Sequence, residues 1–98
     1  MDNDISKILD LFRQINEIPR CSKKEEKIAL WLKKWAETRQ LPVKADDAGN
    51  LMIMVPASAG YEQAPGIVIQ GHMDMVCEKS PDSGHDFSKD PIRHIIDG

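Results

Sequence analysis

The eleven residues GIVIQGHMDMV, from Gly66 to Val76, decide how this chain is expected to fold. The first half, Ile67–Gln70, is short, β-branched and apolar, which is typical of an interior strand of a parallel sheet. The second half places polar side chains directly after that strand. Ligands of α/β proteins bind beyond the carboxyl ends of the strands, so His72 and Asp74 stand where polar side chains become useful.

His72 and Asp74 are separated by a single residue. In an extended backbone this spacing directs both side chains to the same face. An imidazole beside a carboxylate suits a divalent metal ion, because the ring nitrogen can bind the metal while the carboxylate orients the ring. The alternative is a strand-end ion pair without a metal, since a His-x-Asp triplet is short enough to arise by chance.

Apolar residues at helical spacing predict two amphipathic helices before this strand. The first ends at Pro19, because the residue before a proline is disfavoured in the helical conformation. The second begins at a capping box of Ser22 and Glu25 and runs to about Gln40. The apolar stripes consist of Ile5, Ile8, Leu9, Phe12 and Ile15 in the first helix and of Ile28, Trp31, Leu32 and Trp35 in the second.

A β-hairpin is predicted between the second helix and the strand. Val43–Asp46 alternates like a half-buried strand, Asp47–Asn50 supplies turn residues, and Leu51–Val55 is an unbroken apolar run expected to be buried on both faces. Pro56–Pro65 then has the composition of a surface loop. Together with the helices, the hairpin predicts an α/β fold.

The segment after the strand does not complete such a fold. Glu78–Pro91 is polar and long for a loop, and Ile92–Ile96 is a last short strand candidate. No helix follows Ile67–Gln70 to form a crossover, so we expect the natural protein to continue past Gly98. Residues 1–98 are expected to form part of one domain, with no second domain present.

Composition and charge exclude several classes of function. Thirteen Lys and Arg against sixteen Asp and Glu give a net charge of −3, which is too mild and too mixed for a nucleic-acid binder. The apolar runs are shorter than the roughly 20 residues that span a bilayer, and Met1–Asp4 lacks a basic signal-peptide start. Cys21 and Cys77 are too few for a disulfide framework and are interpreted as reduced thiols. We therefore expect a cytoplasmic protein with no membrane partner.

The string GHMDMVCEK, from Gly71 to Lys79, resembles the metal-binding signature of the aminoacyl-histidine dipeptidases. This family, also called Xaa-His or cytosol non-specific dipeptidases, belongs to the co-catalytic zinc exopeptidase clan. The resemblance covers essentially all 98 residues and implies the N-terminal part of a zinc-exopeptidase-like α/β/α sandwich. Further motifs agree in order: Ile18-Pro19-Arg20-x-Ser22-x-x-Glu25, Asp47-x-Gly49-Asn50, and His85-Asp86-Phe87-x-Lys89-Asp90-Pro91 with Ile95-x-Asp97-Gly98.

The resemblance implies a role for each residue of the candidate site. His72 would bind one of two zinc ions, and Asp74 would be the catalytic acidic residue that orients this ligand. Two zinc ions, or manganese or cobalt in their place, would polarise the scissile carbonyl and activate a water that cleaves an Xaa-His or related dipeptide. The parent enzyme is expected to be a cytoplasmic homodimer. The remaining ligands and the general-base glutamate of the family follow Gly98, so the chain alone is expected to be inactive.

Two other functions compete with the dipeptidase fragment. The first is a free-standing, non-catalytic interaction or regulatory module derived from the peptidase by truncation. The second is a small metal carrier that uses His72, Asp74, Cys77 and His85, which would require residues 78–84 to fold back.

Overall fold

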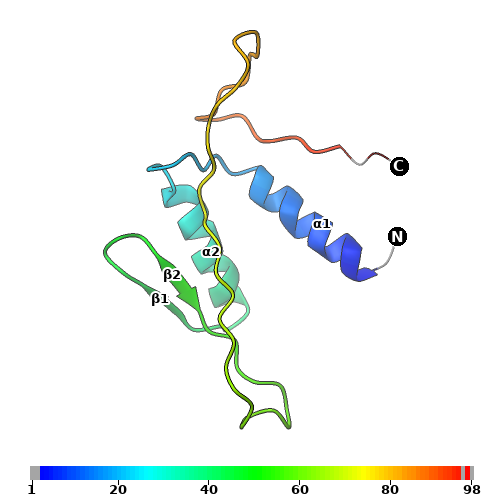
Figure 1. The fold of residues 1–98 in the computed structure, drawn as a ribbon, viewed down its shortest axis with the longest axis vertical. Helices are drawn as coiled ribbons and strands as arrows, with labels where there is room; N and C mark the ends of the chain where they lie inside the picture. Colours follow the sequence, from blue (N-terminus) through cyan, green and yellow to red (C-terminus); the bar gives the residue numbers. More distant parts are fainter. Residues whose placement is uncertain (1–2, 96, 98) are drawn as a thin grey trace. The chain divides into compact units, whose positions relative to one another are not determined.

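The computed structural model describes residues 3–95 and residue 97. In chain order they form helix α1 (Asn3–Asn16), helix α2 (Glu26–Thr38), strand β1 (Val43–Ala45) and strand β2 (Leu51–Ile53), as Figure 1 shows. The predicted α/β character is therefore confirmed. The chain divides into two compact units. We call residues 1–28 with 73–98 the disulfide unit and residues 29–72 the hairpin unit.

Helix α1 confirms the first predicted helix. Asp4 lies in its first turn and Arg13 in its last turn, so each charge opposes the partial charge of the nearby helix end. Its apolar stripe, however, is largely exposed, and Asn16 is the buried residue of this helix. The carbonyl of Asn16 accepts a 2.8 Å hydrogen bond from the amide of Ile92, which joins the C-terminal segment to the end of α1.

Helix α2 confirms the second predicted helix but begins later than the capping box predicts. The backbone turns between Cys21 and Lys24, whose amide donates to the Cys21 carbonyl at 2.8 Å, and Lys23 adopts a left-handed φ of 69°. The Glu25 carboxylate accepts from the Lys23 amide at 2.8 Å, before the helix begins. The prediction of a capping box is wrong, because the hydroxyl of Ser22 donates to the carboxylate of Asp74 instead of accepting from an amide at the start of the helix.

The C-terminus of α2 is closed by a Schellman motif. Gln40 has a left-handed φ of 59°, and the amide of Leu41 donates to the carbonyl of Ala36 at 2.9 Å. The amide of Gln40 donates to the carbonyl of Glu37 at 3.0 Å, which completes the pattern. Among the described residues the buried hydrophobic side chains are Ile28 and Ala36, both on α2, so the core is small.

Strands β1 and β2 confirm the predicted hairpin. They pair antiparallel, with Val43 opposite Ile53 and Ala45 opposite Leu51. Gly49 has a φ of 92°, a left-handed conformation that side-chain-bearing residues rarely adopt and that closes this turn. The expectation that the second strand is buried on both faces is wrong, because Met52 is half exposed.

The strand predicted over Ile67–Gln70 is not formed. The chain is irregular there, and Ile67, Val68 and Ile69 are 86%, 91% and 95% exposed. An interior strand requires a neighbour on each side to satisfy its backbone amides and carbonyls. In the described part of the chain the sheet consists of β1 and β2 alone, so those neighbours are missing.

The strand predicted over Ile92–Ile96 is also not formed between residues 92 and 95, and Ile96 lies outside the described residues. The two intervening segments, Pro56–Pro65 and Glu78–Pro91, are loops and turns, as predicted.

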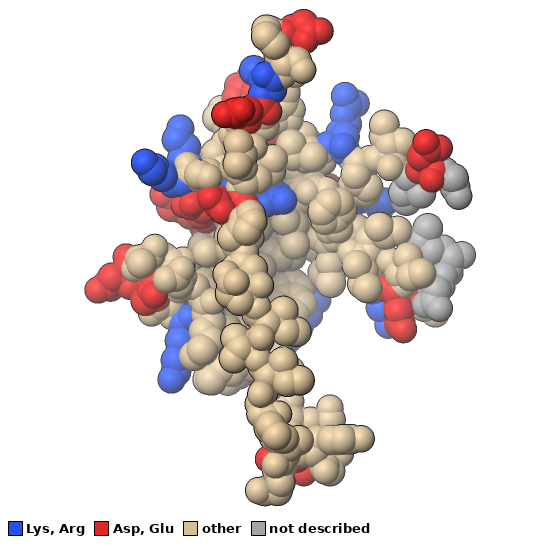
Figure 2. Space-filling model, in the orientation of Figure 1, with Lys and Arg blue, Asp and Glu red and all other residues tan. Residues whose placement is uncertain are grey.

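Figure 2 shows charged side chains of both signs interspersed with uncharged ones. Residues 65–73, the segment before Asp74, contain no Lys, Arg, Asp or Glu. Neither helix of the described region has the length and apolar character needed to cross a membrane.

Candidate functional site

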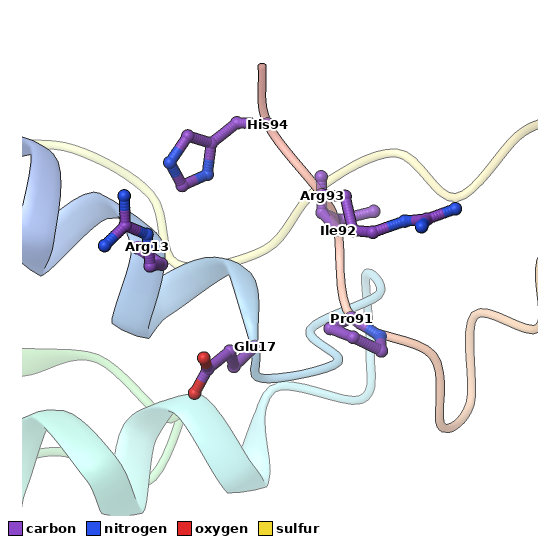
Figure 3. Close-up of a pocket in the computed structure, with 6 residues that line it drawn as sticks. All are labelled: Arg13, Glu17, Pro91, Ile92, Arg93 and His94. Carbon is purple, nitrogen blue, oxygen red and sulfur yellow. The ribbon is translucent and has the colours of Figure 1, made fainter. Parts of the chain in front are cut away.

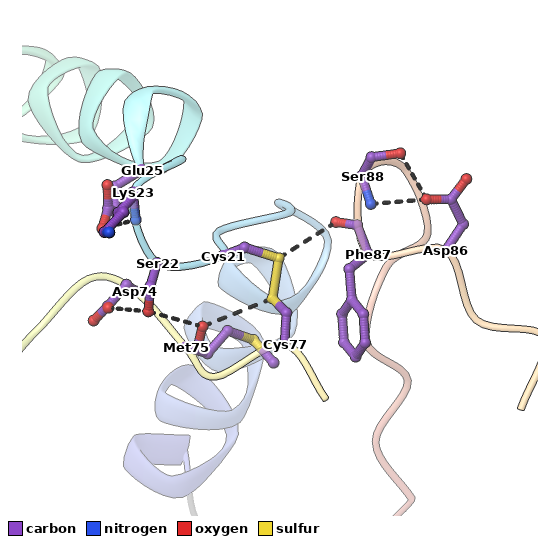
Figure 4. The surroundings of a disulfide bond; sticks show 10 residues. All are labelled: Cys21, Ser22, Lys23, Glu25, Asp74, Met75, Cys77, Asp86, Phe87 and Ser88. Carbon is purple, nitrogen blue, oxygen red and sulfur yellow. Dashed lines mark hydrogen bonds between the residues drawn. A yellow bond between two sulfur atoms is a disulfide. The ribbon is translucent and has the colours of Figure 1, made fainter. Parts of the chain in front are cut away.

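Asp74 lies in a segment that runs beside the chain between α1 and α2. Cys21 and Met75 form a parallel bridge, in which the Met75 amide donates to the Arg20 carbonyl at 2.9 Å. The Ser22 amide donates in turn to the Met75 carbonyl at 3.3 Å. These two bonds form a short ladder that places Ser22 beside Asp74 (Figure 4).

The carboxylate of Asp74 is held by the hydroxyl of Ser22. Ser22 Oγ donates to Asp74 Oδ2 at 2.5 Å, a length typical of a hydroxyl that donates to a charged carboxylate. The Met75 carbonyl is a more distant acceptor for the same hydroxyl, at 3.5 Å. Asp74 is half-buried and Ser22 is exposed, so one oxygen of Asp74 is fixed by a group at the surface.

The two cysteines are joined by a disulfide, and the expectation of two reduced thiols is wrong. Cys21 and Cys77 are 56 residues apart in sequence, yet their Cα atoms are 5.5 Å apart, within the range that a disulfide requires. The bridge between Cys21 and Met75 brings them together. The disulfide therefore closes the ladder covalently, one residue from Ser22 and three from Asp74.

Each sulfur also lies near a backbone carbonyl. Cys21 Sγ is 3.9 Å from the carbonyl oxygen of Phe87, and Cys77 Sγ is 3.7 Å from that of Met75. A disulfide sulfur carries no proton, so these are contacts and not hydrogen bonds in the oxidised protein.

His72 is the last residue of the hairpin unit, where its side chain is exposed, whereas Asp74 belongs to the disulfide unit. Imidazole nitrogen and carboxylate oxygen are ligands that zinc accepts, but a catalytic zinc site takes three protein ligands. In residues 3–95 and 97 no three or more His, Cys, Asp or Glu side chains are grouped to hold a metal ion. By chemistry, each of these two side chains is a donor that a zinc site can use, but the described residues do not group them with a third.

The metal-carrier alternative is wrong. It requires Cys77 as a thiolate, but this sulfur is bonded to Cys21. The grouped ligands that such a carrier needs are also absent from the described residues.

The other two histidines pack against aromatic rings rather than pointing into solvent. The His85 ring centroid lies 4.6 Å from that of Phe87 in an edge-on arrangement, and the His94 centroid lies 5.6 Å from that of Phe12. Both residues are half-buried.

His94 also lines an open cavity of about 420 Å³ in the disulfide unit, drawn in Figure 3. Neither His72 nor Asp74 contributes to this cavity, whose lining residues are Arg13, Glu17, Pro91, Ile92, Arg93 and His94.

Two carboxylates outside the candidate site have lowered pKa values. Hydrogen bonds from the side chain and then the backbone of Asn50 hold the pKa of Asp46 below its ordinary value of 3.8. The side chain of Ser88 lowers the pKa of Asp86 in the same way, followed by the Ser88 amide. Both carboxylates stabilise turns, which explains these pKa shifts without a catalytic role.

The sequence alone does not indicate the role of Ser22 or the disulfide. Ser22 and Asp74 are 52 residues apart, and a serine followed three residues later by a glutamate resembles a helix cap. A pairing over such a distance leaves no local signal in the sequence.

Two known proteins are similar to this chain, one in sequence and one in both sequence and backbone. A cytosol non-specific dipeptidase from Escherichia coli (strain K12) is 44% identical over 89 residues, which cover 91% of this chain and 18% of that protein. The crystal structure of an aminoacylhistidine dipeptidase from Vibrio alginolyticus matches with a TM-score of 0.86 and 43% identity, over 91% of this chain and 18% of that one. No family model matches the sequence.

The structural match confirms the expected fold class, since the two helices and the two-stranded sheet correspond to part of a peptidase domain. The chain spans 18% of the length of each of these two relatives. Over 91% of its length, the chain is therefore similar in sequence and in backbone to part of a dipeptidase.

Proposed function

We propose that residues 1–98 are the N-terminal part of the catalytic domain of a metal-dependent dipeptidase. The observation that carries this proposal is the 44% identity to a cytosol non-specific dipeptidase over 91% of the chain. Identity at this level over nearly the whole chain supports a shared reaction as well as a shared fold. The name of that relative also supports a cytoplasmic location.

His72 and Asp74 are the residues of this chain that we assign to the active site. His72 would supply one imidazole ligand to the metal, and Asp74 would be the carboxylate that orients that ring when the metal is bound. Zinc is the metal that these donors suit, with manganese or cobalt as substitutes, and a bound ion would supply Lewis-acid chemistry at the scissile carbonyl and the attacking water. The remaining ligands lie outside residues 1–98, so the chain alone does not hydrolyse dipeptides.

The substrate is an Xaa-His or related dipeptide, and the parent protein is a homodimer. The name of the Vibrio alginolyticus relative, an aminoacylhistidine dipeptidase, supports this substrate class. The free-standing module is less well supported, because Ile67, Val68 and Ile69 are left exposed in this chain.

The test is zinc-dependent hydrolysis of alanyl-histidine by the full-length gene product. We expect His72→Ala to abolish activity and Asp74→Asn to lower kcat by about 10- to 100-fold, as changes to the residue behind a metal ligand do. His94→Ala is the matched control, because this histidine packs on Phe12 and should leave the reaction unchanged. Full activity in His72→Ala would contradict the proposed site.

A further inference from the structure

We propose that Ser22 is a positioning residue for Asp74 and that the Cys21–Cys77 disulfide makes this positioning depend on the thiol redox state. The inference rests on the proposed function, because it concerns the residue that orients the metal ligand. The observations that carry it are the Ser22–Asp74 hydrogen bond of 2.5 Å and the disulfide that closes the same ladder.

The hydroxyl of Ser22 can hold Asp74 only while the two segments lie side by side. Apart from the disulfide, the bridge at Cys21 rests on two backbone hydrogen bonds, of 2.9 and 3.3 Å. They connect segments more than 50 residues apart, so forming them costs the entropy of closing a long loop. The disulfide removes most of that cost by linking the segments in the unfolded chain as well.

Each cysteine sulfur has a backbone carbonyl nearby that could accept a hydrogen bond from the reduced thiol. When the bond is broken, each sulfur gains a proton, and each already has an acceptor in place. The thiol of Cys21 faces the carbonyl of Phe87 at 3.9 Å, and that of Cys77 faces the carbonyl of Met75 at 3.7 Å. In the reduced protein each thiol would therefore have a backbone carbonyl nearby that can accept from it.

The exchange reaction is balanced with a small thiol as the reductant. Two glutathione molecules reduce the Cys21–Cys77 bond to two thiols and form one glutathione disulfide, and the reverse reaction restores the bond. Both cysteines are half-buried rather than fully buried. The proposal therefore expects a small thiolate to reach one of the two sulfurs.

The first arm of the test measures, in the full-length protein, whether the Cys21–Cys77 disulfide controls the exchange of residues 73–77. Alkylation without reductant should leave Cys21 and Cys77 unmodified, and reduction should expose both. Peptide-level hydrogen exchange over residues 73–77 should then accelerate at least several-fold, and oxidised glutathione should restore the slow rate. The Cys21→Ser/Cys77→Ser variant should exchange at the fast rate under both conditions. Equal exchange rates in the oxidised and reduced protein would overturn the redox part of the proposal.

The second arm measures the role of Ser22 with zinc and alanyl-histidine. Ser22→Ala should lower kcat by about 10-fold or more with KM nearly unchanged, because the hydroxyl acts on a metal-orienting group and not on substrate. Ser22→Thr, which keeps the hydroxyl at an exposed position, should restore at least half of the activity. If Ser22→Thr lowers kcat as much as Ser22→Ala does, Ser22 does not position Asp74.

The two arms also separate this inference from the proposed function. If no form of the protein hydrolyses dipeptides but exchange still depends on redox state, the dipeptidase assignment is overturned and the redox-dependent link is supported. The second arm also compares the kcat of the wild type in its oxidised and reduced forms. If the wild type is active and its kcat is the same in both forms, the dipeptidase assignment is supported and the redox control of Asp74 is overturned.

Discussion

Asp46 shows how a single neighbour sets the charge state of a carboxylate in this chain. The amide and the side-chain nitrogen of Asn50 each donate to Asp46 at 2.8 Å, across the turn between β1 and β2. Both bonds favour the charged form of the carboxylate, which lowers its pKa. The same carboxylate therefore fixes the turn as long as it is ionised.

A pH dependence of the hairpin follows from this shift. Because the folded pKa lies below 3.8, Asp46 stabilises the turn fully above that value, and the contribution is lost as the pH falls through the folded pKa. In a carboxyl NMR titration, the midpoint of Asp46 should lie below 3.8 and should rise towards 3.8 in Asn50→Ala. Asp86 serves as the internal control. Its pKa is lowered by Ser88 and not by Asn50, so its midpoint should stay the same in Asn50→Ala. An unchanged Asp46 midpoint in Asn50→Ala would contradict this explanation.

The elements that the sequence predicts correctly are those that depend on residues a few positions apart in the chain. The two helices follow from apolar residues three and four positions apart, and the hairpin follows from a turn flanked by apolar runs. Ile67–Gln70 has an equally clear composition, but a strand there depends on partner strands, and the described residues contain none beside it. The pairs Cys21–Cys77 and Ser22–Asp74 likewise depend on distant segments, so no local pattern reveals them.

Helix α2 carries the most sensitive packing position. Ile28 is 2% exposed, whereas Leu30 on the same helix is 54% exposed. Truncation of a buried isoleucine removes apolar contacts and leaves a cavity, so Ile28→Ala should lower the free energy of unfolding by about 2 kcal/mol or more. Leu30→Ala, the matched control, should change it by less than about 0.5 kcal/mol. Urea denaturation of both variants checks this, and equal effects would be inconsistent with the small core on α2.

Amide exchange distinguishes the hairpin from the segment that does not form a strand. In the 98-residue chain, amides of β2 that donate across the hairpin should be protected, while those of residues 67–70 should exchange freely. Strong protection over residues 67–70 would instead favour a free-standing folded module. NMR-detected hydrogen exchange resolves the two segments in a single experiment.

For the whole molecule, the central fact is that 91% of the chain matches only 18% of two dipeptidases. Under the proposed function the chain would supply only part of a metal site, and the described residues contain no group of three or more His, Cys, Asp or Glu that could hold a metal ion. The resemblance of Gly71–Lys79 to a metal-binding signature is what singles out His72, since composition and spacing alone leave the ion-pair alternative open. Metal binding must therefore be measured directly to test whether His72 and Asp74 are site residues.

Calorimetric zinc titration tests this claim most directly, on the 98-residue chain and on the full-length gene product in parallel. We predict weak or no binding by the chain alone, submicromolar binding by the full-length protein, and loss of that binding in His72→Ala but not in His94→Ala. Submicromolar binding by the 98-residue chain alone would contradict the account, as would full-length His72→Ala that binds zinc as tightly as the wild type.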